Sequence, residues 1–265
     1  MNTRPDRVEY ERLCDDLVAE QVSLDAMIND FDDATWSKAT PAQGWDVRDQ
    51  VGHLAISEDL ATLAASDSEA FRAELARMLS NAEGPEMEHL RRVRGMAPDA
   101  VIDWWRTARS RTVAALLTHE PTDRLPWAGP HMSAMSFASA RLMETWAHGQ
   151  DIADAVGIER IPTDRLIHIA RLGIRTRRFS YFNRGLPLPV DEVRVELLSP
   201  SGSWWLWGDA AALDRIVGSA LDFCLIVTQR RAVNDTTLDV TGDAAIGWMA
   251  IAQAFAGPPT DARPA

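Results

Sequence analysis

The chain has 265 residues, of which 46% are apolar and 25% charged, as is ordinary for a globular protein with a sizeable core. Its formal net charge of −12, from 39 acidic and 27 basic side chains, disfavours nucleic acid and anionic membranes as partners. The first residues lack the apolar run of a signal peptide, and no stretch is apolar enough to span a bilayer. We therefore expect a cytoplasmic protein that acts on a small molecule, with its oligomeric state left open.

The only two cysteines, Cys14 and Cys224, lie far apart and each within apolar helical sequence. We expect both to be buried, reduced thiols rather than catalytic groups or metal ligands.

Helical periodicity dominates the first part of the chain, where apolar residues recur at steps of three and four. Asp46 with Asp49 three residues later predicts a capped helix start, and Gly157 suits the position just after a helix end. We expect a mainly α fold whose first domain, residues 1–158, is a four-helix bundle with sites built from facing helices. The predicted helical stretches are 6–32, 46–65, 67–80, 99–116 and 132–156, with a break near residues 84–85.

The sequence changes character after Gly157, where helical and strand-like patterns mix. Alternating apolar residues predict strands, and breaker clusters of Gly and Pro separate them from helices. We expect a small α+β domain over 159–257 and a disordered tail over 258–265. Its predicted elements are helices at 161–182, 211–229 and 243–255, and strands at 193–197, 204–207 and 237–240.

Glu144 and His148 lie four residues apart in the helix predicted over 132–156, which places them on one face, one turn apart. Alone, such a pair is also typical of a surface salt bridge. The helix is otherwise apolar and rich in alanine, which indicates that both side chains point inward. His53, on another helix, can face them, and two imidazoles with one carboxylate are the ligands of a catalytic zinc site with an open position.

Several further side chains are candidates for proton transfer or for orienting the imidazoles. Asp151 and Asp154 follow His148 on the same helix and fit either hydrogen-bond acceptors behind a ligand or a solvated acidic turn. His131 fits either a gating residue or a plain loop histidine. His89, His119 and His168 receive no role. The candidate general bases are Asp49, Asp59, His131 and Asp151.

Arginines are the candidate substrate-binding groups. Arg141 precedes Glu144 by three residues and fits either an ion pair with it or a receptor for an anionic substrate. Arg175 belongs to a basic cluster in a strongly acidic chain, together with Arg171, Arg177 and Arg178. This cluster fits either solvated arginines paired with acids or guanidinium groups that bind carboxylates.

The segments 44–55 and 141–157 resemble the DinB-like metalloenzyme superfamily, and more closely its mycothiol-dependent maleylpyruvate isomerase branch. In that branch the equivalents of His53, Glu144 and His148 are the metal ligands, and all three match. The segments 218–231 and 251–259 are similar to an uncharacterised metal-binding subfamily of the same branch. The resemblance implies a divalent metal, with mycothiol as a thiol cosubstrate. The His/Glu ligand set favours zinc, although nickel or iron tolerate the same ligands.

The resemblance implies a metal-dependent enzyme acting on a small electrophilic substrate, either an isomerase or a thiol transferase. An open-position metal can hold a thiol as thiolate, a strong nucleophile at neutral pH. Two other functions stay open: a thiol-independent lyase or hydrolase that uses the metal as a Lewis acid, and a non-catalytic metal-binding module.

Overall fold

A computed structural model describes residues 6–80, 85–129 and 131–261. The chain divides into two compact units, Met1–Glu159 and Arg160–Ala265. Among the described residues, no helix is both long and apolar enough to cross a membrane.

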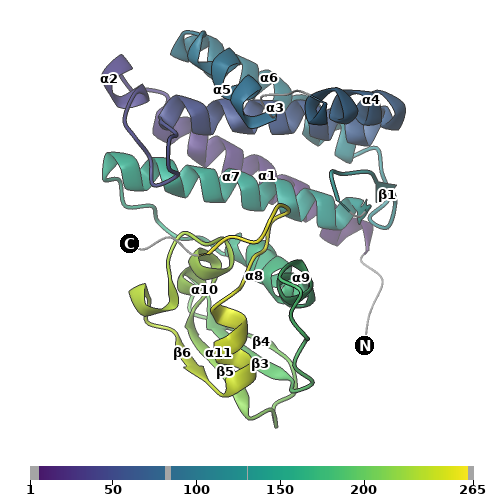
Figure 1. Ribbon diagram of the computed structural model, residues 1–265, viewed down its shortest axis with the longest axis vertical. Coiled ribbons are helices and arrows are strands. Elements are labelled where there is room, and N and C mark those ends of the chain that lie inside the picture. Colours follow the sequence, from purple (N-terminus) through teal and green to yellow (C-terminus); the bar gives the residue numbers. More distant parts are fainter. Residues whose placement is uncertain (1–5, 81–84, 130, 262–265) are drawn as a thin grey trace. The chain divides into compact units, whose positions relative to one another are not determined.

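The first unit is a helical bundle in which α1 lies alongside α7 and α3 alongside α6 (Figure 1). These are the four long helices, and two shorter ones, α4 and α5, pack on α3. A two-stranded antiparallel ribbon, β1 with β2, precedes α7. The elements are α1 Arg7–Ile28, α2 Asp33–Trp36, α3 Val47–Ser66, α4 Ser68–Leu79, α5 Pro85–Arg94, α6 Pro98–Leu116, β1 Arg124–Leu125, β2 Met132–Ser133 and α7 Ala134–Val156.

Local signals set the ends of the two helices that carry the candidate ligands. The Asp46 side chain accepts from the backbone N–H of Asp49, and the Asp49 side chain accepts from that of Asp46, which completes the predicted capping box of α3. Helix α7 ends at Gly157, whose φ of 74° lies in the left-handed region that favours glycine. Both predicted helix boundaries are confirmed.

A continuous apolar core holds α3 against its neighbours. Trp36, Trp105 and Leu54 are among its fully buried side chains. Helix α5, which the sequence did not predict, packs so closely on α3 that a Cβ at Gly52 would lie 2.4 Å from a methyl carbon of Val93. Burial therefore fixes α3, and with it His53, from two sides.

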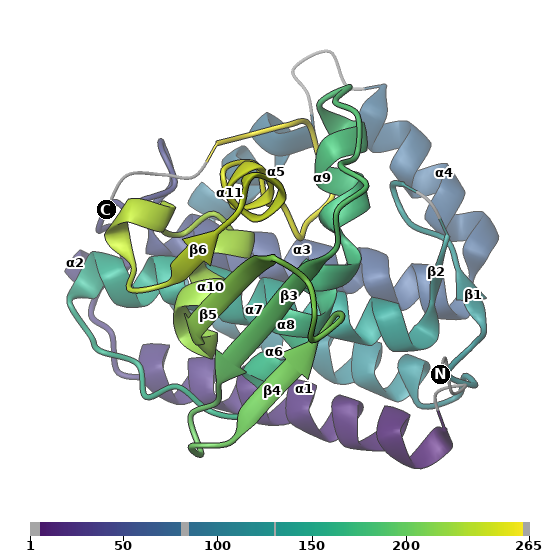
Figure 2. The same ribbon diagram turned by 90° about the horizontal axis from the view of Figure 1, so that it is seen from below.

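The second unit combines short helices with one four-stranded sheet of order β4-β3-β5-β6 (Figure 2). Strand β3 runs parallel to β5 and antiparallel to β4, and β6 runs antiparallel to β5. The elements are α8 Leu166–Arg175, α9 Arg177–Asn183, β3 Val193–Leu198, β4 Trp204–Trp207, β5 Asp214–Ser219, α10 Ala220–Val227, a 3-10 turn Val233–Asp235, β6 Asp239–Thr241 and α11 Asp243–Met249.

The predicted helix over 211–229 is wrong in its first half. Residues 214–219 form β5, which pairs with β3 along its whole length, and only Ala220–Val227 is helical. This pairing joins segments about twenty residues apart, so local periodicity carries no sign of it. The helix predicted over 161–182 starts at Leu166 and divides at Thr176 into α8 and α9, and the last helix ends at Met249 instead of residue 255.

Residues 258–261 of the predicted tail lie against the second unit through hydrogen bonds. The Gln229 Nε2 donates to the Thr260 carbonyl at 2.7 Å, and the Thr260 hydroxyl donates to Gln229 Oε1 at 2.6 Å. The remaining tail residues, 262–265, lie outside the described residues.

Both cysteines are buried as expected, Cys14 in α1 and Cys224 in α10. Burial raises the pKa of the Cys14 thiol to about 11 and moves the pKa of the Cys224 thiol further in the same direction. The Cys224 thiol donates to the Leu166 carbonyl at 3.5 Å. Neither sulfur is therefore a thiolate at neutral pH.

Candidate metal centre

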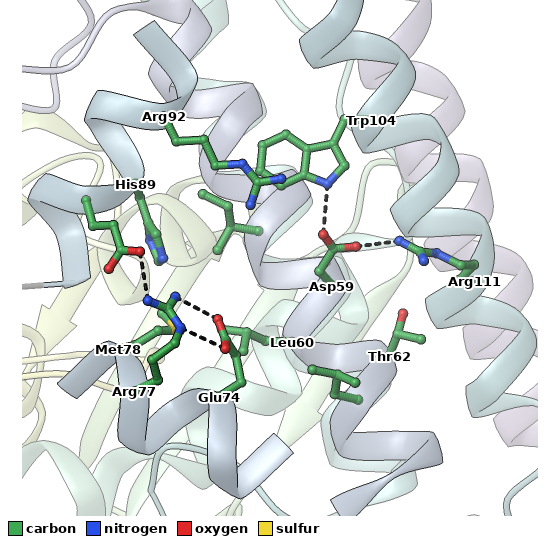
Figure 3. A pocket seen from close by; sticks show the side chains of 13 residues that line it. Asp59, Leu60, Thr62, Glu74, Arg77, Met78, His89, Arg92, Trp104 and Arg111 are labelled. Carbon is green, nitrogen blue, oxygen red and sulfur yellow. Dashed lines mark hydrogen bonds and ion pairs between the residues drawn. The ribbon is translucent and has the colours of Figure 1, made fainter. Parts of the chain in front are cut away.

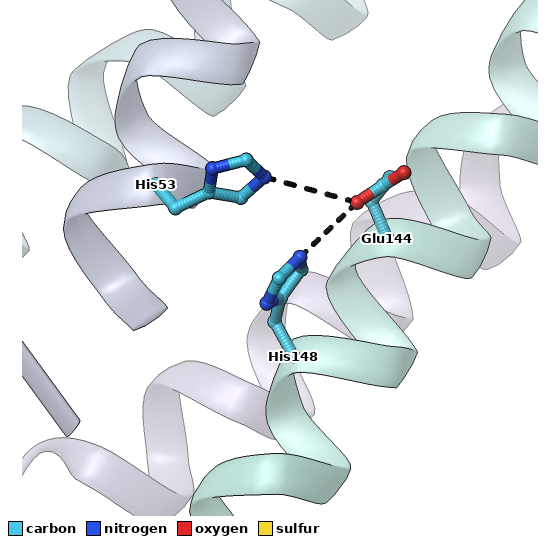
Figure 4. Close-up of side chains that lie close together, drawn as sticks. All are labelled: His53, Glu144 and His148. Atoms are coloured by element: carbon cyan, nitrogen blue, oxygen red, sulfur yellow. Dashed lines mark hydrogen bonds and ion pairs between the residues drawn. The ribbon is translucent and has the colours of Figure 1, made fainter. Parts of the chain in front are cut away.

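Three side chains converge between α3 and α7 (Figure 4). His53 comes from α3, and Glu144 and His148 come from successive turns of α7. Glu144 Oε2 lies 3.2 Å from His148 Nε2 and 4.0 Å from His53 Nε2, and one ligand atom from each residue lies within 4.8 Å of the others. Two imidazole nitrogens and one carboxylate oxygen at this spacing fit the donor set of a divalent metal ion.

A hydrogen-bonded chain fixes which nitrogen of His148 faces the other two side chains. The Trp45 carbonyl can only accept, so the Thr40 hydroxyl donates to it at 3.0 Å, and Gln50 Nε2 donates to Thr40 at 2.8 Å. Gln50 Oε1 then accepts from Nδ1–H of His148, at 2.5 Å. His148 is thereby held with Nε2 facing Glu144, which is the nitrogen that a metal ion bound at this place would take.

An aromatic wall borders the candidate centre. The Trp45 indole stacks on the His148 ring, with centroids 6.1 Å apart and planes 14° apart, and lies 5.1 Å from the His53 ring. The two imidazoles are 4.6 Å apart. Ser57 Oγ lies 3.4 Å from His53 Nε2, one turn further along α3. This packing restricts both rings to orientations that point their nitrogens at one place.

The charge state of the cluster suits a cation. Burial lowers the pKa of His53 to about 3, and the positive charge of Arg141 acts in the same direction, so the imidazole is neutral at pH 7. Burial by itself would raise the pKa of Glu144. The hydrogen bond with His148 and the nearby positive charge of Arg141 outweigh this, so its pKa lies below its ordinary range. A neutral imidazole and an ionised carboxylate are the forms that bind metal.

The cluster is not sealed from solvent. The side chains of His53, Glu144 and His148 keep 34%, 20% and 12% of their surface exposed. Three donors that meet at an accessible place leave room for a further ligand, which distinguishes such a centre from a closed structural site.

The sequence matches the family model for the mycothiol maleylpyruvate isomerase N-terminal domain over residues 17–153, which include all three converging residues. The chain belongs to this family. Two uncharacterized proteins from strains of Mycobacterium tuberculosis are each 42% identical to it over 248 residues, covering 94% of this chain and 96% of theirs.

Solved structures show the same fold. The crystal structure of the mycothiol-dependent maleylpyruvate isomerase matches with a TM-score of 0.55 at 15% identity, covering 89% of this chain and 93% of that chain. A histidine-to-alanine mutant of that isomerase matches with a TM-score of 0.56 at 16% identity over the same shares. The first unit is therefore the DinB-like bundle of the maleylpyruvate isomerase family, followed by a small α+β unit.

Two of the candidate bases in this family member have structural partners. Asp49 is buried, caps α3, and pairs with Arg94, whose Nη2 lies 2.7 Å from its Oδ2. Asp59 accepts from Trp104 Nε1 at 2.8 Å and from Arg111 Nη2 at 2.6 Å. Both carboxylates are thus held by cations or by the backbone.

The other two candidate bases differ in burial. Asp151 is fully buried on α7, where it lies one turn after His148. His131 has an exposed side chain next to β2, and its carbonyl accepts from Arg124. Neither residue belongs to the group formed by His53, Glu144 and His148.

Arg141 is the candidate arginine that lies beside the centre. It is 3% exposed, its guanidinium lies 4.8 Å from the Trp127 ring centroid, and its Nη1 has no hydrogen-bond partner within the described part of the chain. Its positive charge lowers the pKa of Glu144 and that of His53. By contrast, Arg175 is exposed at the end of α8, and Arg177 donates to the Asp191 carbonyl at 3.0 Å.

Sequence reasoning missed two residues near the centre. One is Gln50, which orients His148 and lies one turn before His53. The other is Glu58, a fully buried acid on α3 whose two carboxylate oxygens have no hydrogen-bond partner among the described residues. Burial raises the pKa of Glu58, and the charge of Arg141 partly opposes this. A polar residue on the core-facing side of a predicted helix was the available signal for both.

Proposed function

We propose that the protein is a metal-dependent enzyme that uses a small thiol, mycothiol in the first place, to isomerise or to conjugate a small electrophilic substrate. The observation that carries this proposal is the convergence of His53, Glu144 and His148 at an accessible place in the bundle. Membership in a family named for a mycothiol-dependent isomerase supports the thiol and the reaction class.

A divalent ion bound by these residues would lower the pKa of a thiol that enters the remaining position, so that its sulfur is nucleophilic at neutral pH. The chain supplies no such sulfur itself, because Cys14 and Cys224 are buried and protonated. An external thiol is therefore needed. Addition of the thiolate to an electron-poor double bond and its later expulsion give isomerisation, whereas retention of the adduct gives transfer.

The chain's own residues position and stabilise the reactants. Gln50 holds the His148 ring, and Trp45 limits the approach to one side. Arg141 places a guanidinium beside Glu144, and its Nη1, which has no partner among the described residues, can donate to an anionic oxygen of the substrate as negative charge develops. We propose Arg141 as a substrate-binding residue for this reason.

Elemental analysis tests the metal. We expect about one divalent ion per wild-type chain and none in His148→Ala. The matched control is His119→Ala, because His119 bonds to the Ala65 carbonyl at 2.7 Å and is not one of the three converging residues. Equal metal content in His148→Ala and wild type would refute the centre.

Incubation of the metal-loaded protein with mycothiol and a panel of electrophiles tests the reaction. We expect isomerised product or thiol adduct by chromatography and mass spectrometry, with both lost in His148→Ala. Turnover without thiol would instead identify a lyase or hydrolase. Bound metal with no turnover of the whole panel would favour a non-catalytic metal-binding module.

The second unit is proposed to contribute to substrate binding through Arg175. Under this proposal Arg175→Ala raises the KM and leaves the metal content unchanged, because the exposed guanidinium is not part of the cluster. An unchanged KM would leave the arginines of 171–178 as solvated surface groups.

A further inference from the structure

A pocket of about 360 Å³ lies between α3, α4, α5 and α6 of the first unit, and none of the three candidate metal ligands lines it (Figure 3). Its apolar surface comes from Ile56, Leu60 and Leu63 on α3 and from Met78 on α4. Leu60 follows His53 by two helical turns, about 10 Å along the axis of α3. The pocket is thus a separate cavity in the same bundle.

The acids that line the pocket are already paired. Arg77 lies 2.8 Å from Glu74 and 2.9 Å from Glu88, so one guanidinium holds two carboxylates. Asp59 accepts from the Trp104 indole and from Arg111. Figure 3 shows these bonds around the rim. Because each of these carboxylates is paired with an arginine, the rim does not repel an anion as free carboxylates would.

Two basic side chains of the pocket are free of such bonds. Arg92 and His89 make no hydrogen bond or ion pair with any residue that the structure describes. They lie three residues apart on α5, hence on one face. The Arg92 guanidinium stacks on Trp104, 4.0 Å from the ring centroid, which fixes its plane and leaves its N–H groups unused.

We propose that this pocket binds a small organic acid. The carboxylate would pair with the planar fork of Arg92 and accept a further hydrogen bond from His89, and the hydrocarbon part would lie on Leu60, Leu63 and Met78. The volume is in the range of small-molecule sites, and apolar side chains on one wall face charged and polar ones on the other. The apolar wall favours an organic acid over inorganic phosphate.

This site goes beyond the proposed function, because it needs neither the metal nor a thiol. The groups that would bind the carboxylate, Arg92 and His89, lie on α5, whereas the candidate metal ligands lie on α3 and α7. The two proposals can therefore fail independently.

Calorimetric titration of the full-length protein with benzoate, with inorganic phosphate as the second probe, tests the proposal. We expect saturable benzoate binding that weakens about ten- to a hundredfold in Arg92→Gln, because a hydrogen-bonded charge pair is lost. Arg91→Gln is the matched control, since Arg91 is next to Arg92 on α5, is exposed as Arg92 is, and does not line the pocket. His148→Ala should bind benzoate as the wild type does.

Nuclear magnetic resonance locates the ligand. The Trp104 Nε1–H signal, identified by its loss in Trp104→Phe, should shift on benzoate addition in the wild type and not in Arg92→Gln. The proposal is overturned if benzoate does not bind, if Arg92→Gln binds it unchanged, or if binding is lost in His148→Ala. Phosphate binding as tight as that of benzoate would also overturn it, because a plain anion patch would then explain the data.

Discussion

Gln50→Leu should weaken metal binding although Gln50 is not itself a candidate ligand. Its Oε1 is the only described acceptor for Nδ1–H of His148, at 2.5 Å, and its amide nitrogen is anchored on Thr40. Leucine keeps the volume but removes the acceptor. The His148 ring can then rotate or change tautomer, and loss of such a partner typically lowers metal affinity 10- to 100-fold, about 1.4–2.8 kcal/mol.

Competition with a chromophoric zinc chelator at neutral pH measures this loss. Gln50→Glu keeps an acceptor at the same place, so its affinity should equal or exceed that of the wild type. The matched control is Gln150→Leu, which removes a glutamine bond to Asp154 on α7, at 2.8 Å, two residues beyond His148. Unfolding of the metal-free variants separates damage to the fold from damage to the site. A Gln50→Leu affinity within about twofold of the wild type would refute the orienting role.

Further predictions concern stability. Because the pKa of His53 is about 3 in the folded chain and 6.5 in the unfolded chain, the unfolded state binds more protons between these values. Metal-free protein should therefore lose stability as pH falls from about 6.5 towards 3, by roughly 1–2 kcal/mol after discounting for the partly exposed ring, and His53→Gln should flatten this dependence in urea titrations. Gly52→Ala should cost about 1–3 kcal/mol in the same assay, because its Cβ would meet Val93, and a cost below about 0.5 kcal/mol would contradict the close packing of α5. Gly157→Ala should lower the stability by about 1 kcal/mol through backbone strain alone, since no atom lies within 4 Å of the added carbon, and an unchanged midpoint would contradict the left-handed cap.

The sequence predicted the parts of the fold that local chemistry determines. The helix start at Asp46 and the helix end at Gly157 follow from side-chain caps and backbone freedom, and both are confirmed. Strand β5 was mistaken for helix because its partner β3 is remote in the chain. Helix α5 was missed because its sequence is strongly polar, and of its described side chains, residues 88–94, only Leu90 and Val93 are buried.

At the candidate centre, too, the sequence predicts what local spacing determines and misses what depends on contacts between helices. Helical spacing brings Glu144 and His148 onto one face, so the sequence predicts their proximity, and His53 joins them as expected. Gln50 could not be placed from spacing alone, because its role depends on a bond across to α7. The place of Arg92 over the Trp104 ring likewise depends on a contact between α5 and α6, which no local pattern shows.

The burial of both cysteines has a practical consequence for chemical labelling. Iodoacetamide reacts with exposed thiolates, and the Cys14 and Cys224 sulfurs are neither exposed nor ionised in the folded protein. Alkylation of a mixture of folded protein and an added thiol therefore reports only on the added sulfur. Its rate as a function of pH gives the acidity of that sulfur directly, with no cysteine substitutions needed to silence the background.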